Sequence, residues 1–587
     1  MQASKRARFL DSRNNNEALV SVLSVLPVCV GVIVLMLLPG LAVVLLGFKP
    51  VTLGVGRGYI EALNDPDFRR SFGKSIEYAF LTVPIQIALG IFAAVWVHRV
   101  REGWRVRTLF LMLFLPYAIP SVAAVLVWNF MIRDHGALAA AGAFLSVPRM
   151  WLASDGLFWT LCIVSVWQFF PFVYVTVLAR MRRIPAEQYQ MAEIDGATRW
   201  QQFIWITWPE IRSAVAAIAI VRIAFMFTKF DTPWLLGGAG STYHFVETVP
   251  LWVYRKLSTV NEPAEAIASA GASMMAIFIL VCIGALLWLF RNRTSRRALP
   301  HRKGPCGKLA AGLVASARGG IIMFCIVPFG FLLLGSFLPS GMLDRGIGCV
   351  CATSWTFQNY RQLFSLNYGE YGLHLGITVI VSLAAAVLVL SLCIPGAYAI
   401  TRFVLPVEKP LRGIALWGYL FPPVLLVIPY SKMARLIGSH GTPALAVLIL
   451  ANVALCLPFG LWLMTQYFEA VPMEYDHSAA VDGAGHFRTL ISVLVPRALP
   501  GISAVAIFTF ILSWNDVLLS LYLVPGHLRT LASYADERVF KAGNDQSQYG
   551  EFAVASVIIA GTAIFVLGWA LSSIDRWLCK ERQGVSG

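Results

Sequence analysis

Apolar stretches of about 20 residues recur along the whole chain and are separated by short polar segments. A helix needs about this many apolar residues to cross the hydrocarbon core of a bilayer. The sequence therefore predicts an all-α membrane protein with about twelve transmembrane helices in two groups of six. The apolar windows lie near residues 19–47, 75–97, 108–132, 157–179, 209–229 and 264–290, and again near 319–338, 373–400, 412–431, 442–465, 498–522 and 551–574.

The composition excludes a soluble globular protein. Hydrophobic residues make up 58% of the 587 residues and charged residues only 13%, whereas soluble domains carry about 25% charged residues. The net charge of +16 raises the question of nucleic-acid binding. Most basic residues, however, lie in the short segments between the apolar windows, which is typical of membrane topology. We therefore expect membrane lipid and no nucleic acid among the partners.

The basic residues also indicate the orientation of the chain. Lys5, Arg6, Arg8 and Arg13 precede an apolar run over residues 18–48, which is too long for the central region of a signal peptide and is interpreted as a retained first span. With the N-terminus in the cytoplasm, the inner segments hold 28 Lys or Arg residues and the outer segments 17. This bias predicts that both termini are cytoplasmic.

Residues 291–318 are basic, contain Pro300 and Pro305 and lack periodic apolar positions. They are predicted to form a cytoplasmic linker between two membrane domains. The predicted domains are residues 1–290 and residues 319–587.

Two polar segments of the chain repeat one another at a separation of 287 residues, as from Pro185 to Pro472. Eight identities occur in 25 aligned positions, where unrelated stretches would share about one or two. Six predicted spans lie between the copies, so both copies face the same side and the repeat is parallel. The residues with an identical partner in the second copy are Pro185, Glu187, Ala192, Asp195, Gly196, Ala197, Ile204 and Pro209.

Each copy predicts a short helix, a bend and a second short helix beneath the membrane. The bends are Asp195-Gly196 and Asp482-Gly483, where a backbone with positive φ is expected at the glycine. Prolines 209 and 496 then open the next spans. An alternative interpretation is that each segment merely anchors the bundle at the lipid headgroups.

The two segments resemble the cytoplasmic loop (Glu-Ala-Ala, then Gly, then Ile-x-x-Pro) of permease subunits of binding-protein-dependent ABC importers, and the resemblance extends over nearly the whole chain. It implies that the loops dock on ATPase subunits and transmit their closure. The residues assigned to this role are Glu187, Gln190, Ala192, Asp195, Gly196, Ala197 and Pro209, with Glu474, His477, Ala479, Asp482, Gly483, Ala484 and Pro496. Gln190 and His477 replace the glutamate of the family pattern, so neither loop carries a permanent carboxylate there.

Two further stretches resemble the carbohydrate type of this family. The run from Phe230 and Asp231 to Trp234 is similar to the stretch after the fifth helix of the larger sugar-permease subunit. The run Ser513-Trp514-Asn515-Asp516 is similar to the corresponding stretch of its smaller partner. The resemblance therefore implies a natural fusion of two permease subunits, each of six helices.

No nucleotide site is predicted in the chain itself. The Gly307-Lys308 pair is followed by leucine and lacks a glycine five positions earlier, so it does not match a phosphate-binding loop. We expect no catalytic residues, no metal site and no cofactor bound by this chain. The resemblance implies that two copies of a partner ATPase bind ATP and Mg²⁺, and that an extracytoplasmic binding protein delivers the solute.

Polar and aromatic side chains within the spans suggest a substrate path. Arg222 lies thirteen residues after Pro209 and therefore roughly 20 Å up its helix, near the middle of the membrane. A charge there is expected to be functional, and Arg222 could hold a carboxylate or phosphate of the substrate. The alternative is that Arg222 pairs with an acidic residue of the chain or extends toward the membrane surface. Its repeat partner is Thr509. The other predicted path residues combine an aromatic face with an amide and are Asn129, Trp167, Gln168, Trp514 and Asn515.

The sequence thus predicts the permease of an ABC importer in the cytoplasmic (inner) membrane of a prokaryote, with a sugar or oligosaccharide as cargo. Polyamine, ferric ion or glycerol phosphate remain alternative cargoes. A second alternative is an ion-coupled secondary transporter built from parallel repeats. That class tends to carry acidic residues within its spans, whereas Glu77, Asp231 and Asp516 lie near predicted helix ends.

Overall fold

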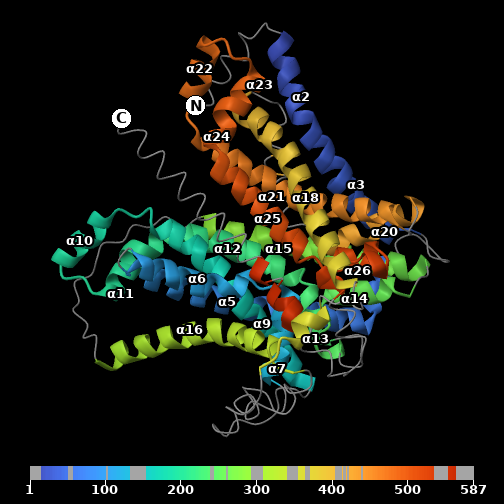
Figure 1. The fold of residues 1–587 in the computed structure, drawn as a ribbon, viewed down its shortest axis with the longest axis horizontal. Helices are drawn as coiled ribbons and strands as arrows, with labels where there is room; N and C mark the ends of the chain where they lie inside the picture. The colour runs from blue at the N-terminus through green and yellow to red at the C-terminus, as the bar shows by residue number, and fades with distance from the viewer. Residues whose placement is uncertain are drawn as a thin grey trace.

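The computed structural model is helical throughout the residues that it describes. These are residues 15–49, 57–100, 103–132, 154–237, 243–259, 262–291, 308–339, 355–363, 370–403, 411, 413, 418, 422–437, 441–534, 553–558 and 560–562. No strand occurs within these ranges (Figure 1). The prediction of an all-α protein is therefore confirmed.

The helices of the first half of the chain lie within residues 15–291. They are α2 (Asn15–Val32), α3 (Leu38–Gly47), α4 (Arg57–Asn64), α5 (Pro66–His98), α6 (Trp104–Ala118), α7 (Ser121–Ile132), α9 (Ser154–Met181), α10 (Ala186–Ile194), α11 (Arg199–Gln202), α12 (Trp208–Phe227), α13 (Asp231–Gly237), α14 (Val249–Leu257) and α15 (Glu262–Arg291). A π-helical stretch, Ile33–Leu37, joins α2 to α3 and makes them one long span.

The second half repeats this order of long and short helices. It comprises α16 (Lys308–Ser336), α17 (Gln358–Leu363), α18 (Glu370–Arg402), α20 (Pro423–Ile437), α21 (Thr442–Ala470), α22 (Glu474–Val481), α23 (His486–Thr489), α24 (Val495–Arg497), α25 (Leu499–Trp514) and α26 (Leu518–Leu523). The helices α5 and α18 correspond to each other and both contain 33 residues.

Ten of the twelve predicted spans have a counterpart in the structure. Within the described ranges, eight helices are long and apolar enough to cross a membrane, and two bent helix pairs raise the number to ten. Of the window at residues 412–431, the structure describes chiefly the part within α20. The window at residues 551–574 lies mostly outside the described residues.

The predicted linker at residues 291–318 includes the last residue of α15 and the start of α16. α15 ends at Arg291, and α16 already begins at Lys308. Residues 308–318 are rich in alanine and leucine, which favour helix, and this preference extends the span beyond its apolar window.

The two bent pairs show where proline interrupts a span. α6 and α7 meet at an angle of 89° around Ile119 and Pro120. In the second half, the run His486–Arg497 meets α25 at 78°, and Pro500 lies in the first turn after this bend. The first half has Ser213 at the position equivalent to Pro500, and the segment Arg199–Gly237 is counted there as a single span. A proline removes one helical hydrogen bond and clashes with the preceding turn, so the two halves differ in shape at this point.

The first span of each half packs against the other half. Val25, Val28 and Val32 of α2 share a core cluster with residues of α18 and α21. The contact is close, because a Cβ added to Gly396 would lie 2.6 Å from Cγ1 of Val28. In return, Ile321 and Cys325 of α16 share a core cluster with residues of α5, α6 and α9. The two halves of the sequence therefore exchange their first helices.

Candidate functional site

The first repeat segment, residues 185–209, forms the predicted helix, bend and second helix. α10 ends at Ile194, and the φ of Gly196 is +75°. The N–H of Gly196 donates to the carbonyl of Glu193 at 3.0 Å, and the N–H of Ala197 donates to the carbonyl of Ala192 at 2.8 Å. This pair of bonds is a Schellman motif, which satisfies the last carbonyls of a helix through a left-handed residue.

The second repeat segment, residues 472–496, closes in the same way. The φ of Gly483 is +78°, and its N–H donates to the carbonyl of Ala480 at 3.1 Å. The N–H of Ala484 donates to the carbonyl of Ala479 at 2.9 Å. Ala192 and Ala479 are both buried beneath the bend. The positive φ that the sequence predicted at both glycines is confirmed, and the motif explains why Ala, Gly and Ala recur at these positions.

Both segments then enter their spans through a π-helical turn at the same repeat position. The turns are Phe203–Thr207 and Leu490–Leu494. Such turns hold one extra residue per turn and often lie near functional sites. The sequence analysis did not predict them, and no residue type in the two stretches marks them.

The two most exposed apolar side chains of each repeat segment lie at equivalent positions. Ile194 is 86% exposed and Trp200 68%, and in the second segment Val481 is 87% exposed and Phe487 76%. Glu187, Gln190, Glu474 and His477 are also exposed. Figure 1 shows the two segments, with α10 and α11 in one and α22 and α23 in the other, at the ends of two diverging arms. Two similar, partly apolar surfaces are therefore free to contact other molecules.

The two segments are attached to their spans by different chemistry. In the first half, the His98 ring at the end of α5 lies 5.8 Å from the ring of Tyr189, whose hydroxyl is 2.9 Å from Oγ1 of Thr207. In the second half, Arg402 at the end of α18 forms an ion pair with Asp476 at 3.1 Å. Burial raises the pKa of the Asp476 carboxyl, although the guanidinium of Arg402 opposes this shift.

A cavity of about 200 Å³ lies between the two halves of the chain. Each half contributes both apolar and polar residues to its lining. The first half contributes Tyr117, Ser121, Gln168, Phe169, Ala224, Phe225, Thr228, Lys229, Phe230 and Asp231, and the second half contributes Gly418, Pro423, Asn452, Leu455, Cys456, Ile511, Leu512, Asn515, Asp516 and Leu518.

Of the predicted path residues, Gln168 and Asn515 line this cavity. Gln168 also caps the break between α6 and α7, because its Nε2 donates to the carbonyl of Ile119 at 2.9 Å. Trp167, Thr509 and Trp514 are fully buried and are not among the lining residues. Asn129 belongs to α7, but its side chain lies outside the described part of the structure.

Arg222 is buried and is not among the lining residues either. Its Nε donates to Oε1 of Gln86 at 2.9 Å, and its guanidinium lies 4.5 Å from the ring centre of Phe169. An amide and an aromatic ring therefore contact this arginine, and Gln86 on α5 brings a polar acceptor to its depth.

The sequence analysis did not assign the charged residues of the cavity to the substrate path. Lys229, Asp231 and Asp516 follow α12 and α25, and a charge at a helix end is ordinarily a solvated one. The sequence feature that could have identified them was the resemblance of the stretches around Asp231 and Asp516 to sugar permeases. Among the described residues, no group of three or more His, Cys, Asp or Glu side chains could hold a metal ion.

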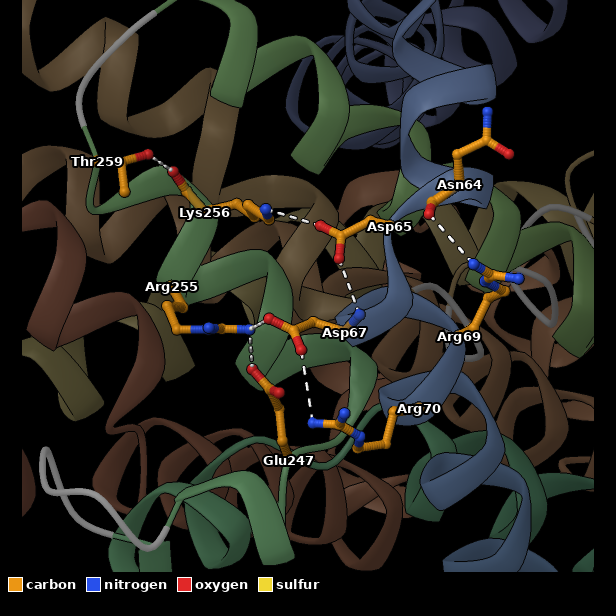
Figure 2. Close-up of polar contacts among 9 residues, drawn as sticks. All are labelled: Asn64, Asp65, Asp67, Arg69, Arg70, Glu247, Arg255, Lys256 and Thr259. Atoms are coloured by element: carbon orange, nitrogen blue, oxygen red, sulfur yellow. Dashed lines mark hydrogen bonds and ion pairs between the residues drawn. The ribbon is translucent and has the colours of Figure 1, made fainter.

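A cluster of ion pairs links the start of α5 to α14 (Figure 2). Lys256 contacts Asp65 at 2.7 Å, and Arg255 contacts both Asp67 at 3.1 Å and Glu247 at 2.8 Å. α14 also reaches the second half, because the rings of Tyr254 and Tyr522 lie 5.2 Å apart. The cluster therefore fixes the helix that joins the two halves at the end remote from the repeat segments.

Burial and ion pairing shift two of these carboxyl groups in opposite directions. Burial raises the pKa of Glu247, and the nearby Asp67 adds to the shift while Arg255 opposes it. Burial also acts to raise the pKa of Asp65, but hydrogen bonds from Lys256 and from the N–H of Asp67 outweigh it and lower the value.

Several transport permeases resemble part of the chain. The diacetylchitobiose uptake system permease protein NgcG of Streptomyces coelicolor is 31% identical over 248 residues, which are 41% of this chain and 78% of that protein. The trehalose transport system permease protein SugB of Mycobacterium tuberculosis is 29% identical over 251 residues, or 42% of this chain and 88% of that protein. A crystal structure of a bacterial ABC transporter that imports alginate covers 49% of this chain with 20% identity and a TM-score of 0.43.

The family model described as "Binding-protein-dependent transport system inner membrane component" matches the chain twice, at residues 86–298 and 394–581. The two matches together span more than half of the sequence, and each contains one repeat segment. The chain therefore belongs to the binding-protein-dependent transport permeases and carries two permease domains.

Proposed function

We propose that this permease imports a saccharide and that its two repeat segments are the docking sites of two copies of a partner ATPase. The single observation that carries the docking proposal is the pair of equivalent, exposed apolar surfaces, Ile194 with Trp200 and Val481 with Phe487. Each surface lies on both sides of a Schellman bend, and the two bends have the same hydrogen bonds, so both surfaces have a similar backbone shape. Exposed apolar side chains of this kind mark interaction sites.

The saccharide proposal rests on the relatives and on the cavity. The named relatives transport diacetylchitobiose and trehalose, and a further one, MdxF of Bacillus subtilis, transports maltodextrin. The cavity offers aromatic faces, such as Phe169, beside amide and hydroxyl groups, such as Gln168 and Ser121. This mixture suits sugar rings and their hydroxyl groups.

We infer that the repeat segments face the cytoplasm of an inner membrane and that both termini lie on the same side as these segments. The excess of Lys and Arg in the inner segments supports this orientation. A binding protein would then deliver the solute to the opposite side, where α14 and α26 meet. We assign residues 1–290 and 319–587 to the two permease domains, joined through residues 292–307 and the start of α16.

In this proposal the two ATPases supply the nucleotide chemistry, and this chain supplies the path. Nucleotide bound between the ATPases stabilises their closed state, and the docked repeat segments move toward each other with them. The two arms that diverge in Figure 1 then approach, and the cavity opens on the opposite side. The ATPases shift the equilibrium only by the difference in nucleotide affinity between the two states.

Measurements of ATP binding and hydrolysis by the purified full chain in lipid nanodiscs test whether the nucleotide chemistry belongs to the partner ATPases. We expect neither ATP binding nor ATP hydrolysis by the chain alone, because the sequence contains no phosphate-binding loop. An ABC ATPase encoded beside the gene should bind the chain at two copies per chain, and the variant Ile194→Asp with Val481→Asp should abolish this binding. Hydrolysis by the rigorously pure chain, or undiminished binding by the double variant, would contradict the proposal.

A further inference from the structure

The two halves of the chain contribute equivalent backbone positions to the cavity, but the side chains at these positions differ in charge. α12 and α25 end at equivalent residues, Phe227 and Trp514, and both are followed by two residues of the cavity lining. These are Thr228 and Lys229 in the first half and Asn515 and Asp516 in the second. The repeat therefore places an ammonium group and a carboxylate at the same position on the two sides of one cavity.

The ammonium group is neutralised within its own half. Nζ of Lys229 lies 2.8 Å from Oδ2 of Asp231 and donates to Oγ of Ser121 at 3.1 Å. Asp516 has no such partner, because no cationic side chain of the described residues lies within 4.0 Å of its carboxylate. Its two oxygens accept backbone N–H bonds from Leu519 and Ser520 at 3.1 Å each. The charged side chains that line the cavity thus include one more carboxylate than cations.

Two amide oxygens add to this excess of acceptors. Gln168 is only 3% exposed, and its Nε2 is engaged with Ile119 and Ser121. Its Oε1 and the Oδ1 of Asn515 are buried and have no hydrogen-bond partner within the described residues. Buried acceptors without a partner are unfavourable, and a bound molecule that donates hydrogen bonds relieves this.

No arginine in the described lining offsets these acceptors. Arg222 is absent from the lining and packs on the ring of Phe169, which is itself a lining residue. An anionic cargo would therefore meet a carboxyl group that has hydrogen-bond partners but no cationic partner among the described residues, and two amide oxygens without hydrogen-bond partners, with Lys229 already bound to Asp231. The repulsion of like charges at such a site weakens binding.

We propose that the cavity selects saccharides that carry a free ammonium group, the class of amino sugars, over those that carry a carboxylate or phosphate. This inference rests on the proposed import of a saccharide. The ammonium group would lie against Asp516, and sugar hydroxyl groups would donate to Gln168 and Asn515. Asp516 is then the residue that determines specificity, and its counterpart Lys229 serves to hold Asp231.

Saturation-transfer NMR on the full chain in nanodiscs tests this proposal, because the method detects weak binding. The probes are a disaccharide of glucosamine, its neutral N-acetylated form and digalacturonate, at a pH where the amines are protonated. We expect the glucosamine disaccharide to bind about tenfold more tightly than the neutral form, and digalacturonate to bind most weakly. Asp516→Asn should remove the preference for the cation and leave affinity for the neutral form unchanged.

The control is Glu77→Gln, which removes one carboxylate from the exposed surface of α5 and should leave the order of affinities unchanged. Absence of binding by all three disaccharides would contradict saccharide import itself. Binding in which digalacturonate equals the cationic disaccharide would overturn only the present inference, and so would an unchanged preference in Asp516→Asn. If that variant does not fold, the order of the three affinities in the wild-type chain decides the matter.

Discussion

Arg402, the last residue of α18, lies 3.1 Å from Asp476 of α22 and so ties a membrane span to the second repeat segment. The arginine also donates to the carbonyl of Val471 at 3.0 Å, where α21 ends. His98 and Tyr189 occupy the same place in the first half, without an ion pair between them. At this pair of equivalent positions, an ion pair therefore contacts the second repeat segment and an aromatic contact the first.

Removal of one partner of this ion pair should uncouple the second segment. Arg402 is 7% exposed at its side chain, so Asp476→Asn leaves a buried guanidinium without its carboxylate. We expect a loss of stability of about 2 kcal/mol or more and a loss of ATPase stimulation by the loaded binding protein. Thermal unfolding and ATPase assays of the assembled transporter measure both effects. The double variant Arg402→Gln, Asp476→Asn should lose less stability than the two single losses combined, and simple additivity would contradict a direct pair.

The effect of substituting a glycine in the repeat segments should depend on whether its φ is positive. Gly483 has a φ of +78°, whereas Gly485 in the same segment has a φ of −71°, and a Cβ at either position would meet no atom within 4 Å. Gly483→Ala should strain the bend by about 1–2 kcal/mol and impair uptake at normal expression, and Gly196→Ala should do the same. Gly485→Ala is the matched control and should transport normally. Equal uptake by Gly483→Ala and Gly485→Ala would show that the bend geometry is irrelevant.

Replacement of Arg222 should affect stability and not the choice of cargo. Arg222→Ala removes the hydrogen bond to Gln86 and the contact with Phe169. We expect a loss of about 1.5–3 kcal/mol in thermal unfolding, since a buried hydrogen bond to a charged group disappears. Neutral and acidic saccharides should lose uptake to the same extent. Arg212→Ala on the same helix serves as the control, and a selective loss for acidic cargo in Arg222→Ala would restore the arginine to the substrate path.

The two shifted carboxyl groups in Figure 2 should give opposite pH dependence. The lowered pKa of Asp65 means that its contribution to stability is present above the ordinary aspartate pKa and is lost as pH falls through the folded value. The raised pKa of Glu247 means that its contribution is present below the ordinary glutamate pKa and is lost as pH rises through the folded value. Melting temperatures of Asp65→Asn and Glu247→Gln across the pH range measure these contributions.

At neutral pH we expect Asp65→Asn to lower the melting temperature, with a loss of about 1 kcal/mol that includes its bond to the N–H of Asp67. Glu247→Gln should be neutral or stabilising there, because it removes a buried charge while Arg255 keeps Asp67 as a partner. Equal destabilisation by both variants would show that the pairs, and not burial, dominate the cluster.

The repeat segments were predictable because they are defined by local rules. The Asp-Gly pairs at 195–196 and 482–483 predicted a left-handed residue in each bend. The six predicted spans between the two copies predicted that both lie on the same side of the membrane. The helical class followed in the same way from the apolar windows. The bends at Ile119 and Ala498 contain visible prolines, but the sequence does not state how far a span turns at a proline.

The central site was harder to predict because its contacts join distant parts of the chain. Arg222 is held by Gln86, 136 residues away, and a charge in mid-span looks the same in sequence whether it meets a substrate or an amide. Lys229 and Asp516 lie just beyond the ends of α12 and α25, where charges are ordinary, and only the assembled halves place them in one cavity. The packing of α2 on α18 was equally hidden, since the apolar window at 19–47 has no polar face to indicate a partner.

The exchange of first helices has a consequence for how the chain is made. α2 leaves the ribosome about 340 residues before α18, so at roughly 5–20 residues per second it waits for tens of seconds in the bilayer before its packing surface exists. During that interval Val25, Val28 and Val32 face lipid, which an apolar helix tolerates. When synthesis is complete, α16 has in turn settled on α6 and α7 of the older half. Neither half can complete its packing without the other. Because both halves belong to one polypeptide, each first helix always has the other half available to pack against.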